Sequence, residues 1–308
     1  MKYKIVSNGV NKKGLFLVLT TAIISGFSIF VSKYGVSVIN PYIFTFLKNV
    51  SVALILSALI LAFKNRKIFL KLTPKQWLLL LMIGLIGGCI PFLLFFKGLS
   101  LTTAAQGSFI QKTMFIYIII LASLFLKEKI NKNFLIGVLL LLFGSFVALK
   151  ALPISFGLGD LLILLATILW AIENVISKYA LKKLEGITVA WGRMFFGSIF
   201  ILIFLSITHQ VNIISTLNYH QIGWVIATSL LLFGYVATWY SGLKYIPVSI
   251  ASSILLLGSP VTTLLSLVAT GKINLKELIS GIIILAGLIL IIDLKNFLKQ
   301  IKQSYVRI

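Results

Sequence analysis

Two charged residues stand deep inside apolar stretches of this chain, where a charge needs a chemical reason. Lys112 lies ten residues into an apolar segment, and Glu173 lies 13 residues beyond Asp160 in another. At helical rise these positions are about 15 Å and about 20 Å from the segment ends, well inside a bilayer. Ionisable side chains at such depth are costly and face a bundle interior or a functional site. We therefore expect Lys112 to hold the anionic group of a substrate, and Glu173 to carry a coupling proton or to receive a substrate amine.

A simpler interpretation of these two charges stays open, in which they pair with each other and hold two helices together. Other polar and aromatic residues share their helix faces, because side chains three or four positions apart are neighbours on a helix. The expected substrate-binding set comprises Lys112, Gln111, Trp170, Glu173, Asn174, Ser28, Tyr235 and Trp239. Each aromatic member is equally typical of an ordinary core position.

The segments that must position these residues are apolar and long. Hydrophobic residues make up 59% of the 308, and charged residues only 11%, which a soluble domain does not need. Ten segments approach the length of about 20 residues that crosses a bilayer: 14–38, 42–63, 76–96, 102–126, 133–149, 158–181, 188–208, 221–243, 247–270 and 275–293. The first continues at full spanning length, unlike a cleavable signal peptide. The sequence thus predicts an all-α integral membrane protein with ten transmembrane helices.

The charges predict how these helices are oriented. The chain has 28 Lys and Arg against 6 Asp and Glu. Most of the cations fall in alternate connections, rather than on one face as in a nucleic-acid-binding protein. By the positive-inside rule, both termini are cytoplasmic and the protein is a multi-pass protein of the cell membrane.

An internal repeat divides the chain into two halves. At an offset of 145 residues, Ser32, Lys33, Tyr34 and Lys48 correspond to Ser177, Lys178, Tyr179 and Arg193. Because each half has five helices, an odd number, the two are expected to be inverted repeats. The expected units are a cytoplasmic tail 1–13, repeats 14–150 and 151–293, and a basic cytoplasmic tail 294–308. Lys33 and Lys178 are interpreted as snorkelling to opposite surfaces, with gating as the alternative; for Lys48 and Arg193, phosphate anchoring and lining of the vestibules both stay open.

The duplicated order of several stretches resembles a known family, the EamA-type members of the drug/metabolite transporter superfamily. These stretches include NPYIFTFLKNV, GITVAWGRMFF, GLSLTTAAQGSF and GLKYIPVSIASS. The chain departs from the family pattern in two places. The Trp-Ala pair is kept in the second half as Trp170-Ala171 but reads Ser25-Gly26 in the first, and the acid Glu128 of the first half is replaced by Gly271-Lys272 at the corresponding place in the second. The resemblance implies secondary transport of a small polar or amphipathic metabolite by alternating access, more often export than uptake.

The sequence lacks the residues that other classes of function require. Apart from Glu173, the acids and both histidines lie at segment ends or in connections, which disfavours an enzyme. The single cysteine, Cys89, offers no metal site, and no GxxxxGK[ST] motif indicates ATP-driven transport. We expect no cofactor and no nucleic acid, but a small-molecule substrate, a surrounding lipid bilayer, and a monomer or homodimer. A flippase for a lipid-linked substrate or a passive channel is the alternative function.

Overall fold

The computed structural model describes residues 11–63, 69, 71–149, 155–271 and 275–292, and the regular structure within these ranges is helical throughout. The helices of the first half are α1 (Lys12–Val38), α2 (Pro41–Phe63), α4 (Pro74–Ile83), η1 (Gly84–Cys89), α5 (Ile90–Leu101), α6 (Ala104–Lys112), α7 (Met114–Leu121), η2 (Ala122–Leu126) and α8 (Lys132–Leu149). Those of the second half are α9 (Leu158–Ala180), α10 (Gly186–Ile207), η3 (Val211–Thr216), α11 (Tyr219–Leu243), α12 (Val248–Ile254), η4 (Leu255–Leu257), α13 (Gly258–Thr270) and α14 (Leu275–Ile292).

Each apolar segment expected from the sequence coincides with a helix or with helices that continue one another. Within the described residues, eight helical stretches are long and apolar enough to cross a membrane, and Lys132–Val147 and Val248–Thr262 are shorter apolar helices. Large apolar side chains cover the outer surface, among them Phe16, Phe125 and Val268, which is 85% exposed. Such a surface is stable in lipid rather than in water. The chain is thus an all-helical, multi-pass membrane protein.

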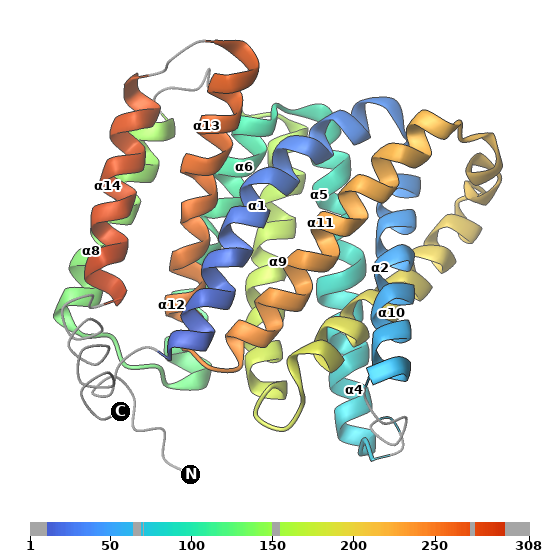
Figure 1. Ribbon diagram of the computed structural model, residues 1–308, viewed down its shortest axis with the longest axis horizontal. Coiled ribbons are helices and arrows are strands. Elements are labelled where there is room, and N and C mark those ends of the chain that lie inside the picture. Colours follow the sequence, from blue (N-terminus) through green and yellow to red (C-terminus); the bar gives the residue numbers. More distant parts are fainter. Residues whose placement is uncertain (1–10, 64–68, 70, 150–154, 272–274, 293–308) are drawn as a thin grey trace.

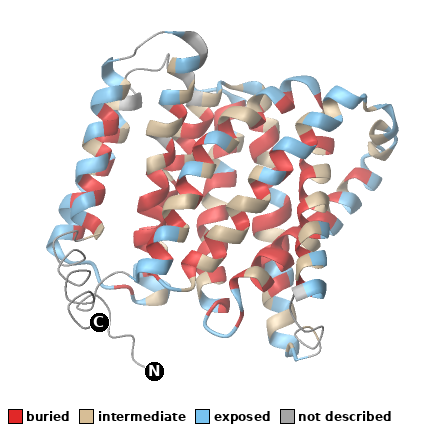
Figure 2. Cartoon of the chain, viewed as in Figure 1, coloured by how far each residue is buried: buried red, intermediate tan, exposed pale blue. Residues whose placement is uncertain are grey.

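The helices form a bundle in which α8 and α14 stand as a pair at one side (Figure 1). Helices α1 and α11 pack along each other, as do α5 and α9, and α2 and α10. Buried residues gather where these central helices meet, whereas the outer faces of α8 and α14 are largely exposed (Figure 2). Each of these packed pairs takes one helix from each half, so residues of the two halves meet at the centre.

Two of the membrane helices are broken at corresponding places. Helix α6 ends at Lys112 and α7 begins at Met114, after Thr113. In the second half, α12 is followed by the short 3₁₀ helix η4 before α13 begins. Discontinuous helices near the middle of the bilayer free backbone groups for a cavity in other transporters.

The repeated lysines Lys33 and Lys178 make the same contacts in the two halves. The Lys33 ammonium donates to the carbonyls of Leu99 and Thr102, at 2.8 and 2.5 Å. The Lys178 ammonium donates to the carbonyls of Leu243 and Ile246, at 2.6 and 2.7 Å. Each lysine therefore satisfies the carbonyls that end a helix, α5 or α11. The snorkelling interpretation placed these ammonium groups at the membrane surface and did not include their hydrogen bonds to backbone carbonyls.

Some expectations fall on parts of the chain outside the described residues. They concern the tail 294–308, most of the tail 1–13, and Lys272.

Candidate functional site

A cavity lies between the central helices of the bundle and is lined by residues of both halves. Its volume is about 60 Å³, which is room for several water molecules. Its lining residues are Ser25, Ser28, Ile29 and Ser32 of α1, Lys48 of α2, Phe92, Phe95 and Phe96 of α5, Gln111 of α6, Met114 of α7, Trp170 and Asn174 of α9, Arg193 of α10, and Leu232 and Tyr235 of α11. The lining is thus a wall of aromatic rings combined with hydroxyl, amide and cationic groups.

The residues expected at the site fall into two groups. Five of them line the cavity: Gln111, Trp170, Asn174, Ser28 and Tyr235. The other three, Lys112, Glu173 and Trp239, lie behind its wall and contact residues that line it or that border it. The Trp239 indole, for example, donates to the Asn174 side-chain oxygen at 2.7 Å.

Lys112 is buried at the break between α6 and α7, where its ammonium donates to the Ser25 hydroxyl at 3.1 Å. A β-carbon added to Gly258 would lie 2.5 Å from the Lys112 ammonium, so this lysine also touches the start of α13. Lys112 and Glu173 make no ion pair within 4 Å, because each side chain has different partners. The interpretation of these two residues as a structural pair is therefore wrong.

Glu173 is completely buried, with 0% of its surface exposed. One carboxylate oxygen, Oε1, accepts hydrogen bonds from the Tyr240 hydroxyl at 2.7 Å and from the Ser177 hydroxyl. The other, Oε2, is buried and has no hydrogen-bond partner among the residues that the structure describes. A buried carboxylate oxygen without a partner is costly, so this position is suited to a proton or to a water molecule.

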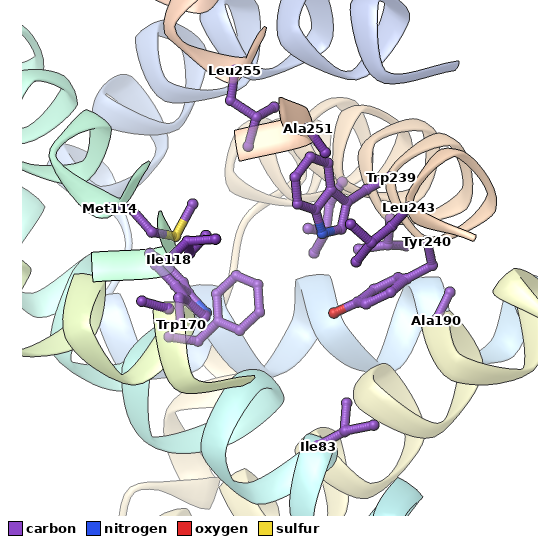
Figure 3. Close-up of a cluster of buried hydrophobic side chains, with 14 of the residues drawn as sticks. Ile83, Met114, Ile118, Trp170, Ala190, Trp239, Tyr240, Leu243, Ala251 and Leu255 are labelled. Carbon is purple, nitrogen blue, oxygen red and sulfur yellow. The ribbon is translucent and has the colours of Figure 1, made fainter. Parts of the chain in front are cut away.

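Arg193 is joined to Glu173 through Tyr240. Its Nη1 donates to the Tyr240 hydroxyl at 2.9 Å, and its Nε donates to the Gly87 carbonyl at 3.2 Å. The Trp170 indole donates to the same carbonyl at 2.9 Å. Arg193, Tyr240 and Glu173 thus form one hydrogen-bonded chain beside the cavity. In Figure 3 the Tyr240 hydroxyl points toward the side of the cluster where Trp170 lies.

The local sequence of η1 and α5 explains why the Gly87 carbonyl is free for these contacts. Pro91 has no N–H group to donate to the carbonyl four residues before it. The π-helical segment η1 precedes this proline, and such segments are frequent at functional sites. A β-carbon on Gly87 would lie 2.3 Å from the Glu173 side chain, so glycine is needed for the close approach.

Lys48 is the second cation of the lining and is only 1% exposed. Its ammonium donates to the Ser32 hydroxyl at 3.1 Å and lies 4.8 and 4.4 Å from the ring centres of Phe44 and Phe96. Arg193 lies in the same way 5.2 Å from the ring centre of Phe92. The Phe92 and Phe96 rings stack at 5.8 Å, so the two cations sit on neighbouring members of one aromatic pair.

The expected site did not include Lys48, Arg193 or the phenylalanines of α5. The signal for the two cations was present, because they occupy corresponding positions of the repeat. Lining of a vestibule was one of the two interpretations left open for them, and both do line the interior cavity. The phenylalanines Phe92, Phe95 and Phe96 gave no comparable signal in a chain with 23 phenylalanines.

Comparison with known proteins finds the same organisation. The profile of the EamA-like transporter family matches twice, at residues 12–150 and 157–293. A protein of Bacillus subtilis named uncharacterized transporter YyaM is 25% identical over 86% of this chain and 90% of its own length. An uncharacterized transporter of Archaeoglobus fulgidus is 26% identical over 91% of this chain and 97% of its own length. One of Methanothermobacter thermautotrophicus is 24% identical over 72% of this chain and 66% of its own length.

A solved crystal structure shares the fold, with a TM-score of 0.72 at 17% sequence identity. The match covers 91% of this chain and 96% of that chain.

Proposed function

Because the chain belongs to the EamA-like transporter family, we propose that it is a secondary transporter for a small polar or amphipathic organic metabolite that bears an anionic group. The observation that carries this proposal is the interior cavity lined by two buried cations, Lys48 and Arg193. A positively charged cavity attracts anionic solutes and disfavours cationic ones. The aromatic rings of the lining add apolar contact for the rest of an amphipathic solute.

The proposed mechanism is alternating access by two inverted five-helix halves in the cell membrane, with both termini cytoplasmic. Three observations support the duplication, and an odd number of five helices in each half would invert one half relative to the other. The family profile matches twice. Lys33 and Lys178 satisfy helix ends in the same way. The chain also turns through a left-handed residue at corresponding positions, Lys127 with φ 55° and Gly271 with φ 66°. A site between inverted halves can be opened to either side by rocking one half against the other.

We propose that Glu173 carries a coupling proton, with net export as the physiological direction. The proton-carrying role of Glu173 is supported by its burial and by its carboxylate oxygen Oε2, which has no partner among the described residues and which a proton can occupy. The neighbouring Tyr240 and Arg193 connect this carboxylate to the cavity. A change in the charge of Glu173 therefore changes the electrostatic field at the solute. Lys112, which holds Ser25 of the cavity wall, has a positioning role in this scheme rather than direct contact with the solute.

The test combines a ligand screen with transport. Bound solute stabilises the folded state, so a thermal-stability screen of purified protein across amino acids, nucleotides, nucleosides and organic acids identifies binders. Each binder is then loaded into proteoliposomes of defined lipid composition, and its movement is followed with and without a pH gradient. We expect saturable movement of an anionic binder that responds to the gradient. Movement without saturation would indicate a channel, and movement of labelled lipid alone would indicate a flippase.

A further inference from the structure

The two cations of the cavity differ in one respect that the repeat makes visible. Lys48 and Arg193 correspond at an offset of 145 residues, as do Ser28 and Glu173, and Ser32 and Ser177. Phe96 and Tyr240 correspond at 144 residues. The cation, the ring, the hydroxyl and a fourth residue therefore recur at corresponding sequence positions in both halves. The fourth residue is an acid in the second half and a serine in the first.

In the second half, the negative charge that balances the buried cation belongs to a residue of the protein, Glu173. Arg193 donates to the Tyr240 hydroxyl, which donates to Glu173, and Ser177 donates to the same carboxylate. The guanidinium group and the carboxylate both lie close to Gly87, whose added β-carbon would lie 3.3 Å from Arg193 Nε and 2.9 Å from the carboxylate carbon of Glu173. Arg193 is thus balanced by a residue of its own chain.

In the first half the balancing acid is missing. Lys48 contacts the Ser32 hydroxyl and the rings of Phe44 and Phe96. Within the described part of the chain, no carboxylate lies within 4 Å of its ammonium group, and none is joined to it through a shared hydroxyl as Glu173 is joined to Arg193 through Tyr240. Ser28 stands where Glu173 stands in the other half, and both Ser28 and Lys48 line the cavity.

We propose that Lys48 is the anion-binding residue of the cavity, and that the carboxylate or phosphate group of the solute takes beside it the place that Glu173 takes beside Arg193. This inference rests on the proposed function. A buried cation without a counter-charge is costly, so an anion that arrives beside Lys48 is stabilised more than one that arrives beside the balanced Arg193. The Lys48 ammonium has three donors, one of which Ser32 uses, so two are available to an oxyanion. The Ser28 hydroxyl supplies a further donor from the same wall.

The first experiment needs no ligand. Ser28→Glu puts the missing acid into the first half, and Ser28→Gln is its neutral control of nearly the same size. We expect Ser28→Glu to have a higher melting temperature than Ser28→Gln, and this difference to vanish when both carry Lys48→Met. A Ser28→Glu variant no more stable than Ser28→Gln in the Lys48 background would overturn the proposal, because Lys48 would then not be an unbalanced cation facing position 28.

The second experiment uses phenylacetate, succinate and inorganic phosphate as anionic probes, with phenylacetamide as the neutral and phenethylamine as the cationic counterpart. The purified protein is heated with each probe. We expect at least one anion to raise the melting temperature, and neither counterpart to do so. In Lys48→Met and Ser28→Glu the apparent affinity for that anion should fall about tenfold or more, the loss expected for a hydrogen bond to a charged group. Ser28→Gln brings no negative charge and keeps a hydrogen-bond donor, so its loss of affinity for the anion should be smaller than that of Ser28→Glu.

The outcomes separate this inference from the proposed function. Anion-dependent stabilisation that persists in Lys48→Met overturns the Lys48 subsite and leaves the transport of anionic solutes standing. Stabilisation by phenethylamine or phenylacetamide alone overturns both, and so does the absence of stabilisation by all three anions in the unmodified protein.

Discussion

Helix α12 depends on a residue of the other half for the cap of its first turn, and removal of that residue should destabilise the fold. Its N-cap residue is Pro247, which provides no side-chain hydrogen bond. Instead, Glu128 accepts from the backbone N–H groups of Val248 and Ser249, at 2.9 and 3.1 Å, and from the Ser249 hydroxyl. The corresponding helix of the first half, α6, is capped by its own Thr103, which accepts from the Gln106 N–H at 3.1 Å.

The magnitude for Glu128→Ala follows from these contacts. The loss of a helix cap costs about 0.5–2 kcal/mol. Buried donors left without a partner cost about 1–3 kcal/mol, and Glu128 itself is only 8% exposed. Because the two effects describe overlapping contacts, we expect a loss of about 2–4 kcal/mol in the free energy of unfolding. Glu128→Gln keeps one acceptor oxygen but loses the charge, so it should lie between the unmodified protein and Glu128→Ala.

The assay is SDS-induced unfolding in mixed micelles, followed by far-UV circular dichroism. The matched control is Glu185→Ala, which removes the surface ion pair to Lys244, a 2.7 Å contact between side chains that are 55% and 30% exposed. A pair of this kind contributes about 0–1 kcal/mol. A local cap should compensate in part, so Pro247→Ser in the Glu128→Ala background should recover about 1 kcal/mol. Equal stability of Glu128→Ala and Glu185→Ala would refute the reasoning.

Three further predictions concern orientation, coupling and the helix ends. Cysteines introduced at Lys75 and His220 should react with an impermeant reagent from the cytoplasmic and the external side respectively; reaction of both from one side would contradict the inverted topology. Glu173→Gln should remove the pH dependence of solute movement in proteoliposomes, because the buried carboxylate can no longer bind and release a proton; an unchanged pH profile would assign coupling elsewhere. Lys33→Met and Lys178→Met should each lower the free energy of unfolding by about 1–3 kcal/mol, since each removes two charge-assisted hydrogen bonds to helix-ending carbonyls. A clear loss of stability in one variant alone would show that the two contacts are not equivalent.

The helices could be predicted from sequence because hydrophobic length is a strong and local signal. Every apolar segment is helical, and the boundaries agree to within a few residues for most of them. The break at Thr113 could not be predicted in the same way, because Thr113 does not force a helix to end. The break at η4 does have a local signal, since Pro260 has no N–H group to donate to the carbonyl of Leu256, four residues before it.

Depth along a helix identified buried charges but not the direction in which they point. Lys112 and Lys48 are both buried cations, yet Lys112 points to Ser25 and Gly258, and Lys48 lines the cavity. On a helix, one residue further along turns the side chain by about 100°, which decides whether it lines the cavity or points away from it. A single sequence does not determine this rotation of the helix. The polar stripe of Trp170 and Asn174 on α9 could be predicted, because polar groups in an apolar helix must find partners inside the protein.

The repeat itself turns out to be the more informative guide to asymmetric function. The two halves meet the same physical needs, a capped helix start and a counter-charge for a buried cation, with different residues. Where Thr103 caps its own helix in one half, Glu128 caps from across the interface in the other. Where Glu173 balances Arg193 in one half, Ser28 leaves Lys48 unbalanced in the other. One half satisfies such a need with its own residues. The other half then depends on a group from outside itself. For the helix start this partner is Glu128. For the cation we propose an anionic group that enters the cavity, so the missing acid at position 28 is a more specific argument for an anionic solute than the presence of a lysine alone.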